Sequence, residues 1–264
     1  MASKKKNGKP KNLVAAAREG GSATKPRIDP KRLWEGVKSL AVTIAIFLVL
    51  RTFFVEAYRI PSGSMMPAML VGDWLFVNKL RYGPHLPFTK VRLPGYAEPR
   101  RGEIVVFISP VQVDQPWDPT PIVVKRLIGM PGDTVHSREG VVHINGDAQQ
   151  LGYAVAGSGA PGDEYYPLFD WQRRIAVADS RFGPPPERPT LDDWGPLVVP
   201  EGHYWMMGDS RYNSKDSRYW GVVPRENVRG RPLFVYFSYN ANDSDRPLPF
   251  ITDIRWSRLG HILR

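Results

Sequence analysis

The feature that most constrains this chain is one apolar run, residues 37–55, which reads VKSLAVTIAIFLVLRTFFV. Its uncharged centre covers only residues 40–50, but Lys38 and Arg51 lie near the ends, where long side chains can reach lipid headgroups. With both included, the run spans about 28 Å as a helix, close to the thickness of a hydrocarbon core. We therefore predict one transmembrane helix over residues 36–55.

The positive charge of the chain is concentrated ahead of this run. The formal net charge is +10, and residues 1–35 hold seven Lys and three Arg against three acidic residues, which is +7 and leaves +3 for the remainder. A basic flank beside an apolar run is typical of the cytoplasmic side of a membrane anchor and not of a DNA-binding face. We predict that residues 1–35 form a disordered cytoplasmic tail, that the chain beyond residue 55 is extracytoplasmic, and that no nucleic acid is a partner.

A cleaved signal peptide is the alternative interpretation of the same run. Val55-Glu56-Ala57 has the small-residue character of a cleavage site. The leader ahead of the run is about 36 residues long, however, and this is far longer than the charged region of a secretory signal. A retained, single-pass anchor in the cytoplasmic membrane is therefore favoured.

Beyond the anchor, short apolar runs alternate with Gly and Pro, of which the chain has 24 and 26. The length of these runs and their β-branched and aromatic content favour strands, and Asn145-Gly146 is typical of a hairpin turn. We predict a mainly β fold, with an antiparallel core formed by residues 56–137 and 200–264 and an inserted β subdomain at 138–199. The predicted strands are Trp74–Val77, Ile104–Ile108, Ile122–Ile128, Val141–Ile144 and Leu233–Tyr239.

Two segments carry candidate reactive side chains. Ile60–Met69 reads IPSGSMMPAM, where Gly63 permits a sharp turn between two serines; a Ser/Gly/Pro linker is the alternative. Val123–Val135 places Lys125 directly after an apolar IVV run. A lysine on the apolar face of a strand loses hydration, which lowers its pKa, whereas an edge lysine would only block aggregation.

A third segment, Met206–Gly221, reads MMGDSRYNSKDSRYWG and is dense in short polar residues between apolar ends, as in a buried, hydrogen-bonded turn. Other hydrolase chemistries have less support. The chain has no cysteine, and none of its five histidines lies in a hydrolase motif or in a metal-binding HExxH spacing. We predict no metal and no cofactor.

Taken together, and in this order behind an anchor, the three segments resemble the type I signal peptidase family, also called the bacterial leader peptidase family. The resemblance runs from about Arg51 to the end of the chain and includes RGEIVVF at Arg101–Phe107. SGSM, KR..G.PGD and GD.R..S.DSR are jointly specific. The sequence departs from the family pattern at Ala68-Met69, Ser210 and Tyr212, which concerns peripheral loop contacts.

The resemblance implies a membrane-bound serine endopeptidase that removes N-terminal signal peptides from exported preproteins after small residues at P1 and P3. Ser64 would be the nucleophile and Lys125 the general base of an acyl-enzyme mechanism, with the Ser62 hydroxyl and the Ser64 N–H as oxyanion hole. Expected partners are secretory preproteins, the lipid bilayer and the translocation machinery. By the same resemblance, Ser214 would orient Lys125 through its hydroxyl, and Asp209 with Arg126 and Asp216 with Arg218 would form supporting ion pairs. The expected substrate-binding residues are Tyr58, Ile60, Leu75 and Val124.

Two alternatives stay open at this point. Self-cleaving repressor-type proteases share the Ser/Lys dyad but carry a DNA-binding domain, whereas this chain begins with a basic tail and an apolar run. An inactive homologue that binds signal peptides without cutting them is the other alternative. The presence of Ser64, Lys125, Ser62 and Ser214 argues against it.

Overall fold

A computed structural model of the chain describes residues 30–86, 89, 91–149, 167–177 and 181–263. The chain has two compact units, one that ends at Ile46 and one that begins at Phe47. Most of the predicted tail, residues 1–29, lies outside the described residues.

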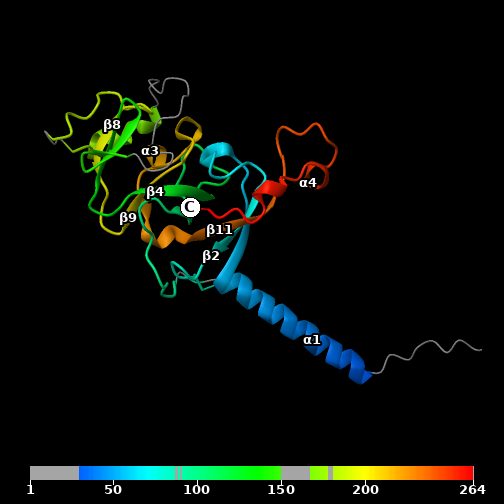
Figure 1. The fold of residues 1–264 in the computed structure, drawn as a ribbon. Coiled ribbons are helices and arrows are strands. Elements are labelled where there is room, and N and C mark those ends of the chain that lie inside the picture. Colours follow the sequence, from blue (N-terminus) through cyan, green and yellow to red (C-terminus); the bar gives the residue numbers. More distant parts are fainter. Residues whose placement is uncertain (1–29, 87–88, 90, 150–166, 178–180, 264) are drawn as a thin grey trace, which may run out of the picture. The chain divides into compact units, whose positions relative to one another are not determined.

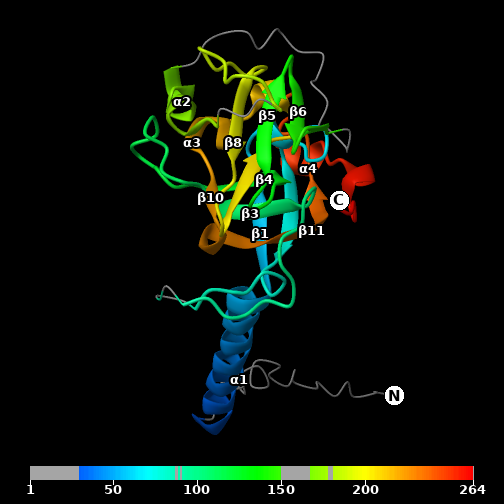
Figure 2. The same ribbon diagram turned by 90° about the vertical axis from the view of Figure 1, so that its left-hand side faces the viewer.

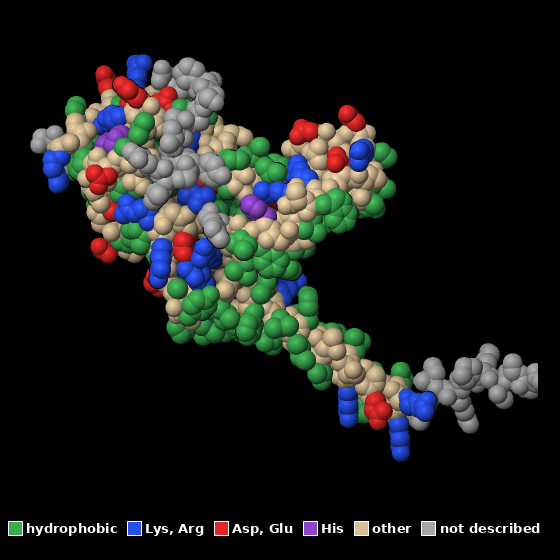
Figure 3. All heavy atoms as spheres, in the orientation of Figure 1, with side chains coloured by type: hydrophobic (Ala, Val, Ile, Leu, Met, Phe, Trp, Pro, Cys, Tyr) green, Lys and Arg blue, Asp and Glu red, His purple; other side chains and the backbone are tan. Residues whose placement is uncertain are grey.

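The first helix, α1, covers Pro30–Val49 and continues as a π-helix over Leu50–Phe54. It begins at Pro30 rather than at residue 36, because proline is well suited to the first turn of a helix, so the last residues of the predicted tail are helical. None of its residues is buried, and by length and composition it can cross a membrane. Figure 3 shows hydrophobic side chains along it and Lys and Arg at its start.

The larger unit is built on a seven-stranded sheet in the order β1-β2-β11-β3-β4-β9-β10, in which every pairing is antiparallel (Figures 1 and 2). The mainly β, antiparallel fold is therefore confirmed. In chain order the strands are β1 (Val55–Arg59), β2 (Asp73–Asn78), β3 (Ile104–Ile108), β4 (Ile122–Gly129), β9 (His203–Met207), β10 (Val223–Pro224) and β11 (Val228–Ser238).

Strand β3 lies between two apolar layers. Ile104 and Val106 pack in one core cluster, with Leu75 and Val235, while Val105 and Phe107 pack in the other. Because both of its faces are covered, the strand reads as a continuous apolar run rather than an alternating one. Its sequence thus predicts its bounds, which the structure reproduces.

A second sheet, in the order β7-β6-β5-β8, packs in a core cluster that it shares with Ile128 of β4 and with Trp205 and Met207 of β9. It begins at Thr134, ahead of the predicted insertion boundary at 138. Asn145 and Gly146 both have positive φ, as a type I′ turn requires, and they join β6 to β7 in the predicted hairpin. Residues 150–166 and 178–180 of the insertion lie outside the described residues. The strands are β5 (Thr134–Arg138), β6 (Val141–Ile144), β7 (Asp147–Ala148) and β8 (Trp194–Val198).

Some strands differ from the prediction. β11 begins at Val228 rather than Leu233. Its register with β2 shifts after Pro232, and a proline inside a run argues against a strand, so the sequence did not predict the first half of β11. β1, β5, β8 and β9 were not predicted, because β1 directly continues the apolar helix and β8 has Gly and Pro at its centre. The short helices are α2 (Trp171–Ile175), α3 (Ser217–Trp220) and α4 (Pro249–Thr252).

Candidate active site

Two parts of the chain bring Ser64 and Lys125 together. Ser64 is the central residue of a short 3-10 helix, Gly63–Met65, that follows β1, and Lys125 lies on β4. The Nζ atom of Lys125 and the Oγ atom of Ser64 are 2.7 Å apart, which is hydrogen-bonding distance. Lys125 is 4% exposed, so the pair is largely closed off from water.

The segment that holds Ser64 is fixed by its neighbours. Met65 and Met69 are buried in the core and anchor the turn. The chain turns at Gly63 as a 3-10 helix, closed by a 3.0 Å hydrogen bond from the N–H of Met66 to the Gly63 carbonyl, and Gly63 does not adopt the left-handed conformation there. Glycine is favoured there by close packing, since a Cβ atom would lie 3.0 Å from Sδ of Met66 and 3.3 Å from Nδ2 of Asn213.

Gly208 is a site residue that the sequence did not single out. A Cβ atom at this position would lie 2.1 Å from Oγ of Ser214 and 2.5 Å from the carbonyl oxygen of Ser64. That carbonyl oxygen accepts a hydrogen bond from the N–H of Ser210 at 3.1 Å. Since Ser210 makes this contact through its backbone, its departure from the family pattern leaves the bond intact. The GD pair in the third motif was the available signal for Gly208.

Two bidentate ion pairs surround the Ser64–Lys125 pair. Arg126 donates to both carboxylate oxygens of Asp209, each at 2.7 Å, and to the carbonyl of Gly102 at 2.6 Å. Arg218 donates to both oxygens of Asp216, each at 2.8 Å. Arg218 and Asp216 are almost wholly buried, and a bidentate geometry of this kind fixes side-chain positions as well as charge.

Burial sets the protonation of Lys125. Desolvation lowers the pKa of its amine to about 8, while the carboxylates of Asp216 and Asp209 raise this pKa and the guanidinium of Arg218 lowers it. Because each carboxylate is already paired with an arginine, their effect is partly cancelled and desolvation dominates. The lysine is thus much closer to neutrality than a lysine in water.

The two other serines expected in the site, Ser62 and Ser214, lie in different surroundings. The Oγ atoms of Ser62 and Ser64 are 3.5 Å apart, so both hydroxyls face one region. Ser214 is buried beside Gly208, and its Oγ has no hydrogen-bond partner among the described residues. The hydrogen bond expected between Ser214 and Lys125 is therefore not formed in this structure.

A small cleft of about 100 Å³ opens beside the pair. Three of the expected substrate-binding residues line it: Tyr58, Ile60 and Val124. Ser62, Ser64 and Lys125 also line it. Leu75 does not. It is wholly buried because its side chain faces the core from β2, where it packs in the same cluster as Ile60.

The cleft lies between two strand edges. Within the described residues, β1 pairs with β2 alone, and its other edge carries no strand. The pairing of β4 with β9 begins at Arg126, so that Ile122–Val124 is unpaired on that side. In the described part of the chain, no group of three or more His, Asp or Glu side chains could hold a metal ion. The site can therefore present a nucleophile, a base and two open backbone edges to an extended chain.

Known proteins resemble this chain over most of its length. The family described as signal peptidase, peptidase S26, matches residues 33–237. Signal peptidase I of Pseudomonas aeruginosa is 37% identical over 213 residues, which cover 76% of this chain and 72% of that protein. Signal peptidase I of Leptolyngbya laminosa is 32% identical over 221 residues, covering 83% and 86%. A crystal structure of a signal peptidase I from Enterococcus faecalis is 31% identical and covers 51% of this chain and 96% of its own, with a TM-score of 0.32.

Proposed function

The chain belongs to the signal peptidase family, peptidase S26, and from that premise we propose that Ser64 and Lys125 are the nucleophile and general base with which it works. The protein is a serine endopeptidase that removes signal peptides. The observation that carries the assignment of the two residues is the 2.7 Å contact between Ser64 Oγ and the buried amine of Lys125.

The first half of the reaction forms an acyl-enzyme. The neutral amine of Lys125 takes the hydroxyl proton of Ser64 while Oγ attacks the carbonyl carbon of the scissile bond. The resulting ammonium then gives that proton to the leaving amine, and the C–N bond breaks. With a pKa of about 8, about one lysine in ten is neutral at pH 7, against about one in 3,000 for an unperturbed lysine.

The second half releases the product. A water molecule gives a proton to Lys125 and attacks the acyl carbon, and Ser64 Oγ leaves and recovers its proton. In both halves, charge develops on the carbonyl oxygen. We assign its stabilisation to the backbone N–H of Ser64 and the hydroxyl of Ser62, and losing one such donor typically costs about 10²–10³ in turnover. The Arg126–Asp209 and Arg218–Asp216 pairs hold the scaffold around these groups.

Substrate recognition follows from the two open edges. An extended segment of the preprotein adds as a strand between β1 and Ile122–Val124 of β4, where backbone hydrogen bonds supply affinity. The cleft of about 100 Å³ has roughly the volume of three water molecules. Only small side chains fit such a space, and this supports cleavage after small residues at P1 and P3.

The protein is membrane-anchored through its apolar N-terminal helix. The excess of Lys and Arg ahead of the helix supports a single-pass topology with the N-terminus in the cytoplasm and the β unit on the extracytoplasmic side of the cytoplasmic membrane. In that position the site meets signal peptides as they leave the translocation machinery, which raises their effective concentration.

Cleavage of a preprotein by purified variants tests the assignment. We expect Ser64→Ala and Lys125→Met to abolish processing while both proteins still insert in membranes. Lys215→Met and Ser244→Ala remove the same side chains elsewhere and serve as matched controls that should retain activity. Wild-type cleavage by either Ser64→Ala or Lys125→Met would refute the assigned role. Binding without cleavage by the wild type would instead favour the inactive homologue.

A further inference from the structure

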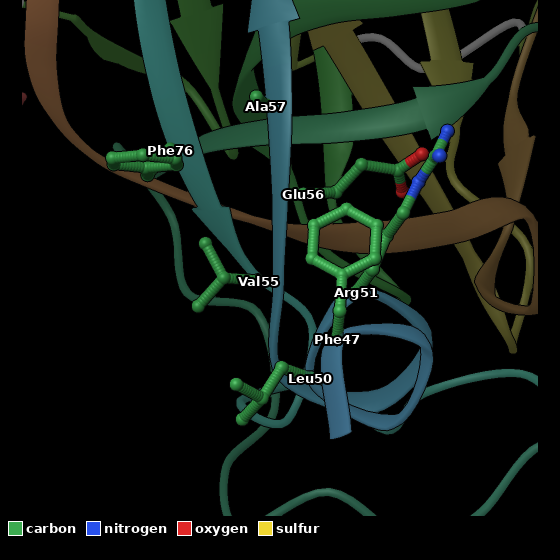
Figure 4. A pocket seen from close by; sticks show the side chains of 7 residues that line it. All are labelled: Phe47, Leu50, Arg51, Val55, Glu56, Ala57 and Phe76. Atoms are coloured by element: carbon green, nitrogen blue, oxygen red, sulfur yellow. The ribbon is translucent and has the colours of Figure 1, made fainter. Parts of the chain in front are cut away.

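A second apolar groove lies at the beginning of β1, next to the cleft along the same strand. It has a volume of about 440 Å³, within the usual range for ligand sites. Its lining is mostly apolar, and the charged Arg51 and Glu56 also contribute to it. Figure 4 shows the side chains of these residues around β1. The apolar lining residues are Phe47, Leu50, Val55, Ala57 and Phe76.

The exposure of these side chains is unusual. Phe47 is 58% exposed and Leu50 is 50% exposed, and both lie at the end of the apolar helix, where exposed apolar side chains can contact a membrane or a bound ligand. Ala57 and Phe76 are cross-strand partners on β1 and β2, and the small alanine leaves the groove open. Leu50 and Arg51 of the π-helix Leu50–Phe54 line the groove, and π-helical turns are frequent at functional sites.

The groove and the cleft are lined by successive stretches of the chain, and a strand paired to the free edge of β1 presents side chains to both faces of the sheet. Val55–Ala57 lines the groove, and Tyr58–Ser62 begins the cleft at the next residue. An extended chain rises about 3.3 Å per residue, so Ala57 lies about 10 Å, or roughly three residues, before Ile60. A peptide bound along the free edge of β1 therefore reaches the groove a few residues away from its scissile bond.

The position of β1 in the chain, directly after the apolar helix, indicates which part of the peptide reaches the groove. β1 follows directly from the apolar helix, and the part of a preprotein that resides in the membrane is the apolar region of its signal peptide. At the groove mouth, Glu56 forms an ion pair with Lys79 at 3.3 Å, and this places charge beside the apolar walls, as expected at a membrane surface.

We propose that the groove formed by Phe47, Leu50, Val55, Ala57 and Phe76 binds the C-terminal end of the apolar region of the signal peptide, upstream of the cleavage site. The inference rests on the proposed function and adds a subsite to it. The groove would recognise large apolar side chains, whereas the cleft admits small ones. It would contribute to substrate binding and leave the chemical step to Ser64 and Lys125.

Filling the groove tests the proposal. We expect Ala57→Trp, at an exposed strand position that tolerates aromatic residues, to raise KM for a preprotein with a complete signal peptide by about tenfold and to leave kcat unchanged. A short peptide that carries only the residues around the scissile bond should be cleaved by this variant as by wild type. Val113→Trp, at a loop position that is 80% exposed, is the matched control and should behave as wild type with both substrates.

Three results would overturn the proposal. One is an unchanged KM for the preprotein in a folded Ala57→Trp enzyme. Another is an equal loss with the short peptide, which would show damage to the cleft itself. The third is an effect seen only when phospholipid is present and absent in detergent, which would assign the groove to a lipid chain. Failure of wild type to cleave either substrate would refute the proposed function instead, so the two failures are distinguishable.

Photo-crosslinking gives a direct readout that does not depend on turnover. A photoreactive phenylalanine derivative in place of Phe76 should crosslink to the apolar region of the signal peptide in Ser64→Ala enzyme. Crosslinks to the mature part of the preprotein would contradict the proposal.

Discussion

Folded proteins in water mostly bury large apolar side chains and expose charged ones. The apolar helix departs from the first rule, and the β core departs from the second. The helix exposes its large apolar side chains, for example Leu40 at 61% and Phe47 at 58%, and buries none of them. The core buries charges, including Lys125, Asp216 and Arg218. In water both arrangements are costly. The exposed apolar helix is suited to a membrane anchor. Among the described residues, the core pairs Asp216 with Arg218 and leaves the buried amine of Lys125 without a carboxylate of its own.

The largest effect should come from removing the ability of that amine to become neutral. In Lys125→Arg, the guanidinium is never deprotonated in a protein, so no base is available at any pH. We expect kcat/KM to fall by about 10⁴, the upper end for a general base. A profile of kcat/KM against pH measures this, and activity that returns at high pH would contradict it.

The next largest effect should be a loss of stability when one partner of a buried ion pair is removed. Arg218→Met leaves Asp216 as a buried, unpaired carboxylate and should lower the free energy of unfolding by about 3–5 kcal/mol. Lys215→Met breaks the exposed pair with Asp114 and should cost less than about 1 kcal/mol. Denaturant unfolding measures both. Adding Asp216→Asn to Arg218→Met should recover part of the loss, and no recovery would indicate that packing rather than charge is responsible.

Lys125→Met should change the free energy of unfolding in the opposite direction. The variant should be more stable than the wild type, although it is inactive. The pKa of Lys125 is about 8 when folded against 10.5 for an ordinary lysine, so the folded state binds fewer protons between these pH values. Below pH 8 the charged lysine therefore destabilises the core by about 3 kcal/mol, from which about 1 kcal/mol is subtracted for the hydrogen bond to Ser64.

We expect Lys125→Met to gain about 2 kcal/mol at pH 7 in denaturant unfolding. The wild type should gain on the variant as the pH rises from 8 to 10.5, because its cost disappears when the amine is neutral. A difference that does not change with pH would mean that desolvation does not set the protonation of Lys125.

A nearby negative charge should shift the pH profile by a smaller amount. Val124→Asp places a carboxylate beside Lys125 and brings water into the cleft, and both changes favour the ammonium. The acidic limb of kcat/KM should move up by about one pH unit from about pH 8. Val124→Thr is a control of similar size that should leave the limb in place. An unmoved limb in a folded Val124→Asp enzyme would argue for a different base.

The smallest effect should come from removing the helix. Residues 1–46 form a separate unit, and none of the residues in α1 is buried. We expect residues 47–264 to remain folded, with a free energy of unfolding within about 1 kcal/mol of the full chain in detergent. Circular dichroism and thermal unfolding measure this. A truncated protein that does not fold would show that the helix supports the core as well as anchoring it.

The sequence predicted which polar side chains of the candidate site come together better than it predicted their surroundings. Ser64, Lys125 and the two arginine–carboxylate pairs lie in short motifs, where residue type and spacing carry the chemistry, and the structure places these groups close together. The strand β3 was predictable because both of its faces are covered and it is apolar throughout.

Features that depend on distant parts of the chain were not predictable. Leu75 has the character of a pocket residue, but only the register of β2 shows that it faces the core. The role of Gly208 depends on Ser214 and on the carbonyl of Ser64, far away in the sequence. Ser214 was expected to contact Lys125, yet residue type alone does not fix the direction of a hydroxyl.

The unpaired stretch of β4 at Ile122–Val124 has a consequence for which proteins can be processed. If recognition uses that edge, a cargo segment must offer its own backbone N–H and C=O groups. A folded domain has already committed these groups to its helices and sheets. The enzyme cannot bind such a domain as an added strand, even where the domain contains a sequence that would fit the cleft. Cargo that folds early after export is thereby protected from internal cutting, and its timing of folding becomes part of the selectivity.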